Sequence, residues 1–108
     1  MTTTQNCLNC FAGEGFLTSD VDLSYDTAKN TAKATFYVDN PVLLGKNAQP
    51  HHNKFYVVVY GKKARQIANS LSKGSKVTFS GSITTWSRND EAGVTVNADK
   101  VCWPGRTE

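Results

Sequence analysis

The sequence predicts a small all-β domain with a single helix, and three observations lead to this fold class. Several segments alternate polar and apolar residues, which is the period of a half-buried strand. Apolar residues recur at helical spacing in only one segment, residues 64–71. A chain of 108 residues with 39% hydrophobic residues can bury one core and little more. We therefore expect a single domain over residues 1–108, with its core at about residues 7–105.

The first half of the chain predicts two strands. Residues 7–17, CLNCFAGEGFL, form the first, and Gly13 and Gly15 within it indicate a bend or bulge. Three aspartates then mark turns, and residues 23–25 predict a short strand end. Residues 32–41, AKATFYVDNP, alternate between two faces and predict the second strand. We expect its inner face to carry Ala34, Phe36 and Val38, and its outer face to carry Lys33, Thr35 and Tyr37.

A loop separates this strand from the third. Pro41 is expected to end the second strand, and residues 40–53, with two prolines and one glycine, predict a long loop. Residues 54–60, KFYVVVY, alternate again and predict the third strand. We expect its inner face to carry Phe55, Val57 and Val59. Its outer face carries Lys54, Tyr56, Val58 and Tyr60.

One helix and two strands complete the predicted domain. Apolar residues at positions 64, 67, 68 and 71 predict a helix of about three turns, with Gly74 as its C-terminal stop. Residues 75–88, SKVTFSGSITTWSR, predict a strand with Val77, Phe79 and Ile83 inside and Thr84, Trp86 and Arg88 outside. After the turn NDEAG, residues 94–103 predict the last strand. Five strands with one helix between the third and fourth match the Greek-key barrel called the OB-fold, which binds oligonucleotides and oligosaccharides over one face.

The net charge of +3 is mild, but its distribution points to a partner. Residues 40–89 contain eight lysines and arginines and no acidic residue. A polyanionic partner would explain this bias, because each phosphate contacted releases counterions; the alternative is a solvated basic surface. No apolar run approaches the ~18–20 residues of a membrane helix, and the start MTTTQN is no signal peptide. We expect a soluble cytoplasmic protein with no membrane partner.

The three cysteines and the histidines suggest no catalytic chemistry. Cys7 and Cys10 form a C-x-x-C, but zinc sites usually pair two such motifs, and Cys102 is far away in sequence. A redox C-x-x-C should open a helix, whereas this one falls in a predicted strand. We interpret the cysteines as small, semi-buried residues in a reducing compartment, with metal or redox sites as the alternatives. His51 and His52 are assigned no chemistry. Paired carboxylates, a catalytic triad and a phosphate-cradling loop are missing from the sequence, so we expect no enzyme, cofactor or metal.

Three segments of the chain resemble one known family. GFLTSDVDLSY is similar to a G-x-L-x-x-D-P-E-L-R-Y opening, with Val21 and Ser24 at the usual proline and arginine positions. VVVYGKKARQIANSLSKGSKVTFSG resembles a V-V-V-W-G-K-x-A block that continues through L-x-K-G-S-x-V-x-V-x-G, and VTVNADKVCWPG resembles the closing strand. These are motifs of the bacterial-type single-stranded DNA-binding proteins, and the match spans roughly residues 11–105. The central block is the most specific of the three.

The resemblance implies which residues bind DNA. In that family, aromatic rings stack on bases, while lysine and arginine hold phosphates. Tyr60 takes the aromatic position before the Gly-Lys, whereas Lys54 stands where the family often has a ring. Trp86 lies two residues before another aromatic position, which Arg88 occupies here. The implied stacking residues are Tyr60, Trp86, Tyr56 and Tyr37. The implied phosphate contacts are Lys33, Lys54, Arg88, Lys62, Lys73 and Lys76.

Each of these roles has an alternative. Tyr60 and Trp86 could instead cap the core or fill a subunit interface, and Lys62 could simply be solvated at a helix start. Trp103 is expected to pack. The resemblance implies sequence-independent single-stranded DNA binding in replication, recombination or repair, by a homo-oligomer, most often a tetramer. RNA is not distinguished. The alternative function is a primosome or complex subunit whose aromatic face binds protein.

The end of the chain departs from the cellular members of that family. Those members usually continue into a flexible linker and an acidic tip that recruits replication and repair proteins, whereas this sequence stops at PGRTE, directly after the last predicted strand. It is therefore either a shortened form of a longer protein or a tailless phage, plasmid or primosomal relative. From the implied DNA binding we expect a protein associated with the nucleoid.

Overall fold

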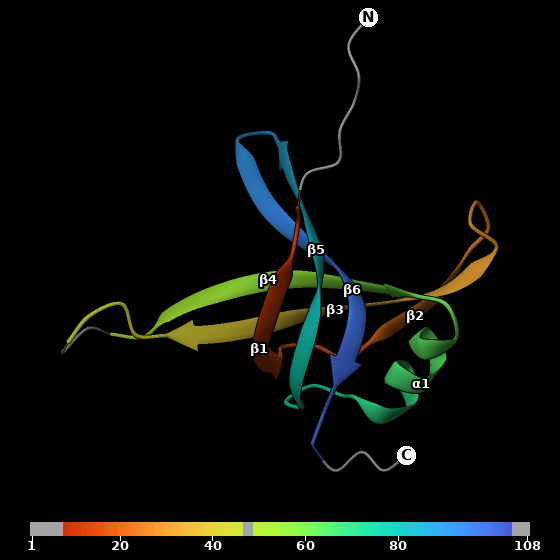
Figure 1. The fold of residues 1–108 in the computed structure, drawn as a ribbon, viewed down its shortest axis with the longest axis horizontal. Helices are drawn as coiled ribbons and strands as arrows, with labels where there is room; N and C mark the ends of the chain where they lie inside the picture. Colours follow the sequence, from red (N-terminus) through yellow and green to blue (C-terminus); the bar gives the residue numbers. More distant parts are fainter. Residues whose placement is uncertain (1–7, 47–48, 105–108) are drawn as a thin grey trace, which may run out of the picture.

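The computed structural model describes residues 8–46 and 49–104, which form one six-stranded sheet and one helix (Figure 1). The elements are β1 (Phe11–Leu17), β2 (Asp22–Asp26), β3 (Thr31–Val42), β4 (His51–Tyr60), α1 (Lys62–Ser70), β5 (Lys76–Arg88) and β6 (Glu91–Cys102). The predicted fold class is confirmed. The additional strand is β2, which pairs with β3 along its whole length and which we had expected only as a strand end.

The sheet closes into a barrel because β1 pairs with two strands. The strand order is β1-β5-β6-β4-β3-β2, and β1 also pairs with β3 through Phe16 and Leu17. We expect a bend or a bulge at Gly13 and Gly15, but β1 pairs with β5 from residue 11 to residue 16 without a bulge. Gly15 instead marks a close approach, since a Cβ there would lie 2.3 Å from the carbonyl oxygen of Asp39. The register shift lies between β5 and β6, at Ser80 and Gly81.

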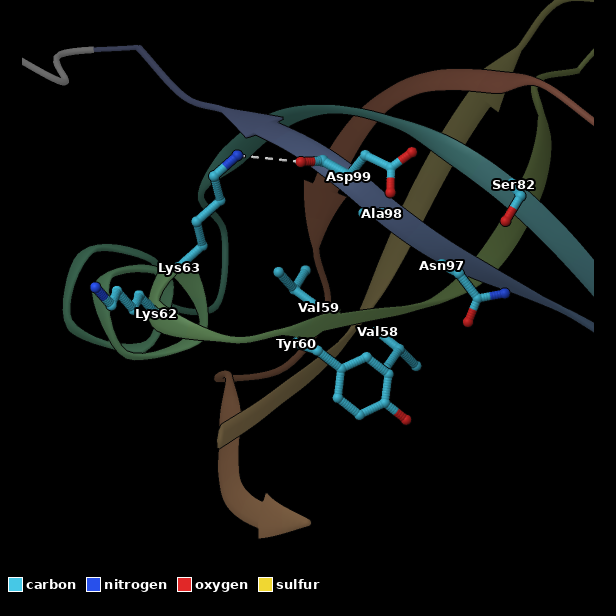
Figure 2. Close-up of a pocket in the computed structure, with 9 residues that line it drawn as sticks. All are labelled: Val58, Val59, Tyr60, Lys62, Lys63, Ser82, Asn97, Ala98 and Asp99. Atoms are coloured by element: carbon cyan, nitrogen blue, oxygen red, sulfur yellow. Dashed lines mark hydrogen bonds between the residues drawn. The ribbon is translucent and has the colours of Figure 1, made fainter. Parts of the chain in front are cut away.

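The helix α1 covers one end of this barrel and contacts β6 through its first turn. Gly61, with a φ of 94°, precedes it, and Leu71 caps its C-terminal end. The helix therefore ends before Gly74, which lies in the turn that leads to β5. The Lys63 ammonium donates a hydrogen bond to the carbonyl oxygen of Asp99, 3.2 Å away (Figure 2). No helix in the described residues is long and apolar enough to cross a membrane.

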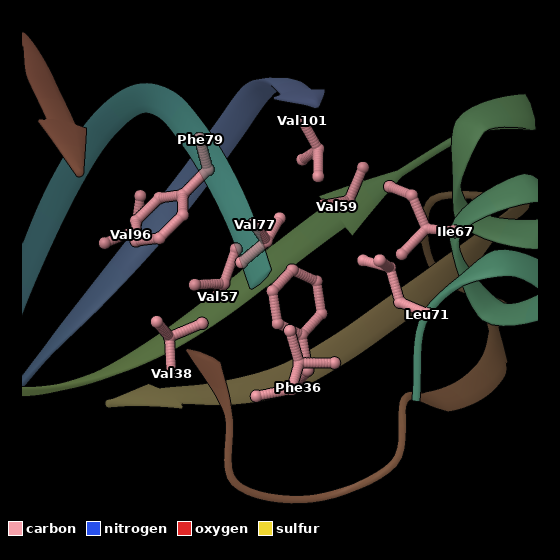
Figure 3. Close-up of a cluster of buried hydrophobic side chains, with 11 residues drawn as sticks. Phe36, Val38, Val57, Val59, Ile67, Leu71, Val77, Phe79, Val96 and Val101 are labelled. Carbon is pink, nitrogen blue, oxygen red and sulfur yellow. The ribbon is translucent and has the colours of Figure 1, made fainter. Parts of the chain in front are cut away.

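The core lies between the inner faces of the strands and the apolar stripe of the helix (Figure 3). The predicted inner residues of β3, β4 and β5 are buried or pack against the core, and Ile67 and Leu71 add the helix. The largest fully buried side chains are Phe36, Phe79, Ile67, Val38, Val57, Val59, Val77 and Val96. Burying each of them stabilises the fold by about 1.5–3 kcal/mol. Trp103 is partly buried against this core, as expected.

The predicted loop over residues 40–53 is wrong at both ends. Asn40, Pro41 and Val42 still belong to β3 and pair with Asn53, His52 and His51 of β4, so only residues 43–50 connect the two strands. Pro41 fits inside the strand because, beyond Asp39, the described part of β3 has β4 as its only partner and its other edge is open. The ring of His52 contacts the Asp39 carboxylate at 3.0 Å and ties the two strands together.

The expected semi-buried position of the cysteines is wrong where the structure describes these residues. Cys10 and Cys102 are both exposed and neither forms a disulfide. Cys102 faces outward because its neighbour Val101 takes the inward position of β6. Cys7 lies outside the described residues, so the C-x-x-C pair stays untested. Across residues 8–46 and 49–104, no three His, Cys, Asp or Glu side chains group together as metal ligands would.

Candidate nucleic-acid interface

Three of the four predicted stacking residues lie around one groove on the outer side of the barrel. Tyr37 of β3 and Tyr56 of β4 are directly opposite each other in the sheet, with their ring centroids 4.9 Å apart. Trp86 approaches from β5, and Arg88 and Thr95 complete the lining. These five residues surround a groove of about 260 Å³. We call it the aromatic groove.

Alternation along the strands leaves these rings outside. The residues beside Tyr37 and Tyr56, among them Phe36, Val38 and Val57, point into the core, so the tyrosines must point away from it. Tyr37 is 53% exposed and Trp86 is 45% exposed. Exposed apolar rings that gather in one place on a small domain are typical of a binding surface.

The position of Trp86 depends on a tight turn between β5 and β6. Asn89 and Asp90 have φ values of 51° and 67°, a left-handed conformation that Asn and Asp tolerate well. The turn is therefore shorter than the predicted NDEAG, and residues 91–93 already belong to β6. The two strands extend as a hairpin beyond the barrel (Figure 1), and this hairpin carries Trp86 opposite Gly93.

Arg88 is the cation inside the groove. It is exposed at the last position of β5, directly opposite Glu91. Even so, the described part of the chain shows no salt bridge to its guanidinium. A guanidinium beside aromatic rings can bind a phosphate in two-point fashion while bases stack on the rings. Arg88 thus places a positive charge at the edge of the aromatic groove.

Tyr60 lies apart from this groove. It is the last residue of β4, four positions beyond Tyr56, which corresponds to about 13 Å along a strand. It lines a separate hollow of about 510 Å³, which we call the Tyr60 hollow. The other lining residues shown in Figure 2 are Val58, Val59, Lys62, Lys63, Ser82, Asn97, Ala98 and Asp99. Strand alternation therefore places Tyr56 and Tyr60 on one face of β4, but the two residues line different hollows.

A lysine covers the ring of Tyr60. The Lys29 ammonium lies 4.1 Å from the ring centroid, and the Lys33 ammonium lies 6.0 Å from it. Such cation–π contacts are worth about 0.5–1 kcal/mol at exposed sites. Lys29 belongs to the turn between β2 and β3, and its backbone N–H donates to the Asp26 carboxylate at 3.2 Å. One face of Tyr60 is thus already in contact with a cation.

The predicted phosphate ligands are spread over the molecule. Lys33 and Lys62 lie near Tyr60, and Lys54 is exposed on β4 opposite Asp39. Lys76 and Arg88 are the two end residues of β5, which is 13 residues long. Lys76 is therefore about 40 Å from the groove along the strand. Its ammonium lies 3.7 Å from the Glu14 carboxylate. The nearby Lys73 is exposed in the turn before β5. The structure does not bring these last two lysines to the groove.

Sequence reasoning missed Lys29 and Thr95. Thr95 could have been found, because Val96 faces the core and alternation then turns Thr95 outward. That it lies beside Tyr56 could not, since this follows from the parallel pairing of β4 with β6. Nothing in the local sequence signals the contact of Lys29 with Tyr60, because the two residues meet only through the sheet.

Comparison with known proteins gives related sequences. The model of the single-strand binding protein family matches residues 9–103. The chain is 35% identical over 71 residues to a single-stranded DNA-binding protein of Clostridium tetani, which covers 66% of this chain and 49% of that protein. It is 34% identical over 79 residues to single-stranded DNA-binding protein 3 of Clostridium acetobutylicum, covering 73% of this chain and 55% of that one. The matches thus span about half the length of these relatives.

A solved structure shares the fold. The small single-stranded DNA-binding protein from Streptomyces coelicolor superposes with a TM-score of 0.72, over 89% of this chain and 94% of that one. At 18% identity this likeness shows the fold alone. It agrees with the closed barrel and its helix, and the OB-fold prediction is confirmed. Because the family model covers nearly all of the described residues, the chain belongs to the single-strand binding protein family.

Proposed function

We propose that this chain binds single-stranded DNA without sequence preference, with the aromatic groove as its main site. The observation that carries this proposal is that Tyr37, Tyr56 and Trp86 surround one open groove together with Arg88. Every base presents a π-face, so rings of this kind bind bases whatever the sequence. The relatives named above are called single-stranded DNA-binding proteins, which agrees with this assignment.

Base stacking is the sequence-independent part of the proposed binding to bases. Each stacked base contributes about 1–3 kcal/mol by alanine substitution. Tyr37 and Tyr56 contact each other with an angle of 46° between their rings, so they act as one platform with two inclined surfaces. Trp86 provides a further surface from the hairpin. Tyr60 is a secondary stacking site, because a base there must use the face that Lys29 leaves open or displace that lysine.

Lysine and arginine side chains are proposed to contact the phosphates of the bound DNA strand. Arg88 holds a phosphate in the groove, and Lys33, Lys54 and Lys62 serve the segments of the strand beside it and near Tyr60. Lys73 and Lys76 take part only when the bound strand is long enough to reach the other end of β5. The proposed role is non-catalytic, within DNA replication, recombination or repair at the nucleoid. The working form is a homo-oligomer, a dimer or tetramer, with replication or repair proteins as further partners.

Titration with oligo-dT tests this function. Tryptophan emission should fall as the oligonucleotide binds, and the affinity should decrease steeply with salt because bound counterions are released. Duplex DNA of the same length is the control and should bind far more weakly. Equal binding of oligo-rU would extend the ligand to RNA. Unchanged emission and unchanged anisotropy of labelled oligo-dT at low salt would overturn the proposal, and the complex-subunit alternative would then be favoured.

A further inference from the structure

Trp86 lies against a position where no side chain is present. Gly93 is its direct partner in the pairing of β5 with β6. A Cβ atom built on Gly93 would lie 2.2 Å from Cζ2, 2.5 Å from Cε2 and 2.9 Å from Nε1 of the indole. These distances are far below van der Waals contact. The indole therefore occupies the space that the side chain of any other residue would take.

Two other glycines of the barrel have close neighbours of a different kind. At Gly15 and Gly81 a Cβ would meet the backbone, namely the carbonyl oxygens of Asp39 at 2.3 Å and Asn97 at 2.0 Å. Backbone atoms in a closed barrel cannot move aside without breaking strand pairing. At Gly93 all three neighbouring atoms belong to one exposed side chain. The backbone conformation of Gly93 does not require glycine either. Among the described glycines, a positive φ occurs at Gly61 and Gly74 and not at Gly93.

The glycine thus has a consequence for the groove rather than for the barrel. With the indole held against the backbone of β6, Trp86 still exposes 45% of its surface and lines the groove with Tyr56 and Arg88. A methyl group at residue 93 would push the ring away from β6 and change the surface it offers to a base. We propose that Gly93 is a positioning residue, whose missing side chain sets the orientation of Trp86 for stacking. This inference rests on the proposed function.

The proposal separates stability from binding. Replacing a strand glycine by alanine lowers the conformational entropy of the unfolded chain, so Gly93→Ala should leave the thermal midpoint unchanged or slightly raised. Its affinity for oligo-dT should nevertheless fall about three- to tenfold, which is part of the loss expected from removing a stacking ring. A purely structural glycine would show the opposite pattern, with reduced stability and unchanged affinity of the folded fraction.

The experiment uses the Trp103→Phe form of the full chain, in which Trp86 is the remaining tryptophan. Three quantities are compared with and without Gly93→Ala: the emission maximum and acrylamide quenching of the free protein, the affinity for labelled oligo-dT, and the thermal midpoint. Ala92→Ser is the matched control, because Ala92 is the adjacent exposed residue and faces the other side of the hairpin, opposite Ser87. We expect Gly93→Ala to change emission and affinity, and Ala92→Ser to change neither.

A double-mutant cycle shows whether Gly93 acts through Trp86. In a Trp86→Ala chain, Gly93→Ala should cause no further loss of affinity, because the ring it displaces is gone. An additional loss there, or unchanged emission and affinity in the single variant, would overturn the inference. If Gly93→Ala alone fails to fold, the inference requires the combination with Trp86→Ala to fold, and unfolding of both contradicts it. Failure of the unsubstituted chain to bind oligo-dT would instead overturn the proposed function.

Discussion

The aromatic groove and the Tyr60 hollow are both lined by a tyrosine of β4, and they differ in what contacts their aromatic rings. In the groove, Tyr37 and Tyr56 contact each other, and the neighbouring cation, Arg88, lines the groove rather than covering a ring. In the hollow, Lys29 lies directly over the ring of Tyr60. Two tyrosines on the same face of one strand are therefore not equivalent as binding groups. Whatever occupies one face of a ring must be displaced or avoided before a base can stack there.

The largest expected effect is the loss of oligo-dT affinity when one ring is removed from either site. Trp86→Ala removes a groove ring and should weaken oligo-dT binding by about 5- to 150-fold, which corresponds to the loss of about 1–3 kcal/mol of stacking. Tyr60→Ala should cost clearly less, because Lys29 already covers one face of that ring. Fluorescence anisotropy of labelled oligo-dT measures both affinities, and circular dichroism checks that both variants fold. A greater loss for Tyr60→Ala than for Trp86→Ala would reverse the ranking of the two sites.

A smaller effect concerns the phosphate contacts at the two ends of β5. Arg88→Ala should lower the slope of log affinity against log salt by about 0.7, the value for one phosphate contact on a single strand. Lys76→Ala should leave the slope on a short oligonucleotide unchanged, because this lysine lies at the other end of the strand beside Glu14. The measurement is a salt titration of affinity for each variant. Equal changes in slope would show that even a short strand reaches Lys76.

The smallest expected effect tests the cover over Tyr60. Lys29→Gln removes the ammonium from the ring, so a base can use both faces of Tyr60. The loss of affinity caused by Tyr60→Ala should then be about two- to fivefold larger in the Lys29→Gln chain than in the unsubstituted one, since an exposed cation–π contact is worth about 0.5–1 kcal/mol. A double-mutant cycle on oligo-dT affinity measures this difference. Lys46→Gln, an exposed lysine in the loop after β3, is the control for the lost charge. Purely additive losses would show that Lys29 does not compete with the base.

Much of the barrel could be predicted because alternation is a local property. The core-facing side chains of β3, β4 and β5 follow from this alternation, and Phe36, Val57 and Phe79 are buried as expected. Thr35 and Val58, which we expect on the outer faces, are buried as well, because their strands are paired on both sides at these positions.

The helix followed in the same way from its apolar stripe, although it ends at Ser70 and not at the expected stop, Gly74. The loop at 40–53 could not be predicted, since Pro41 is tolerated in β3 only because the neighbouring edge is open.

The sequence by itself indicated that Tyr37, Tyr56, Tyr60 and Trp86 lie on the outward faces of their strands. Only the tertiary structure decided how they are grouped. The antiparallel register of β3 with β4 put Tyr37 beside Tyr56, and the β5–β6 hairpin brought Trp86 and Arg88 to them. The turn before β3 placed Lys29 over Tyr60. The physical reason is that face follows from neighbours two residues apart, whereas grouping follows from strand pairings between distant parts of the chain.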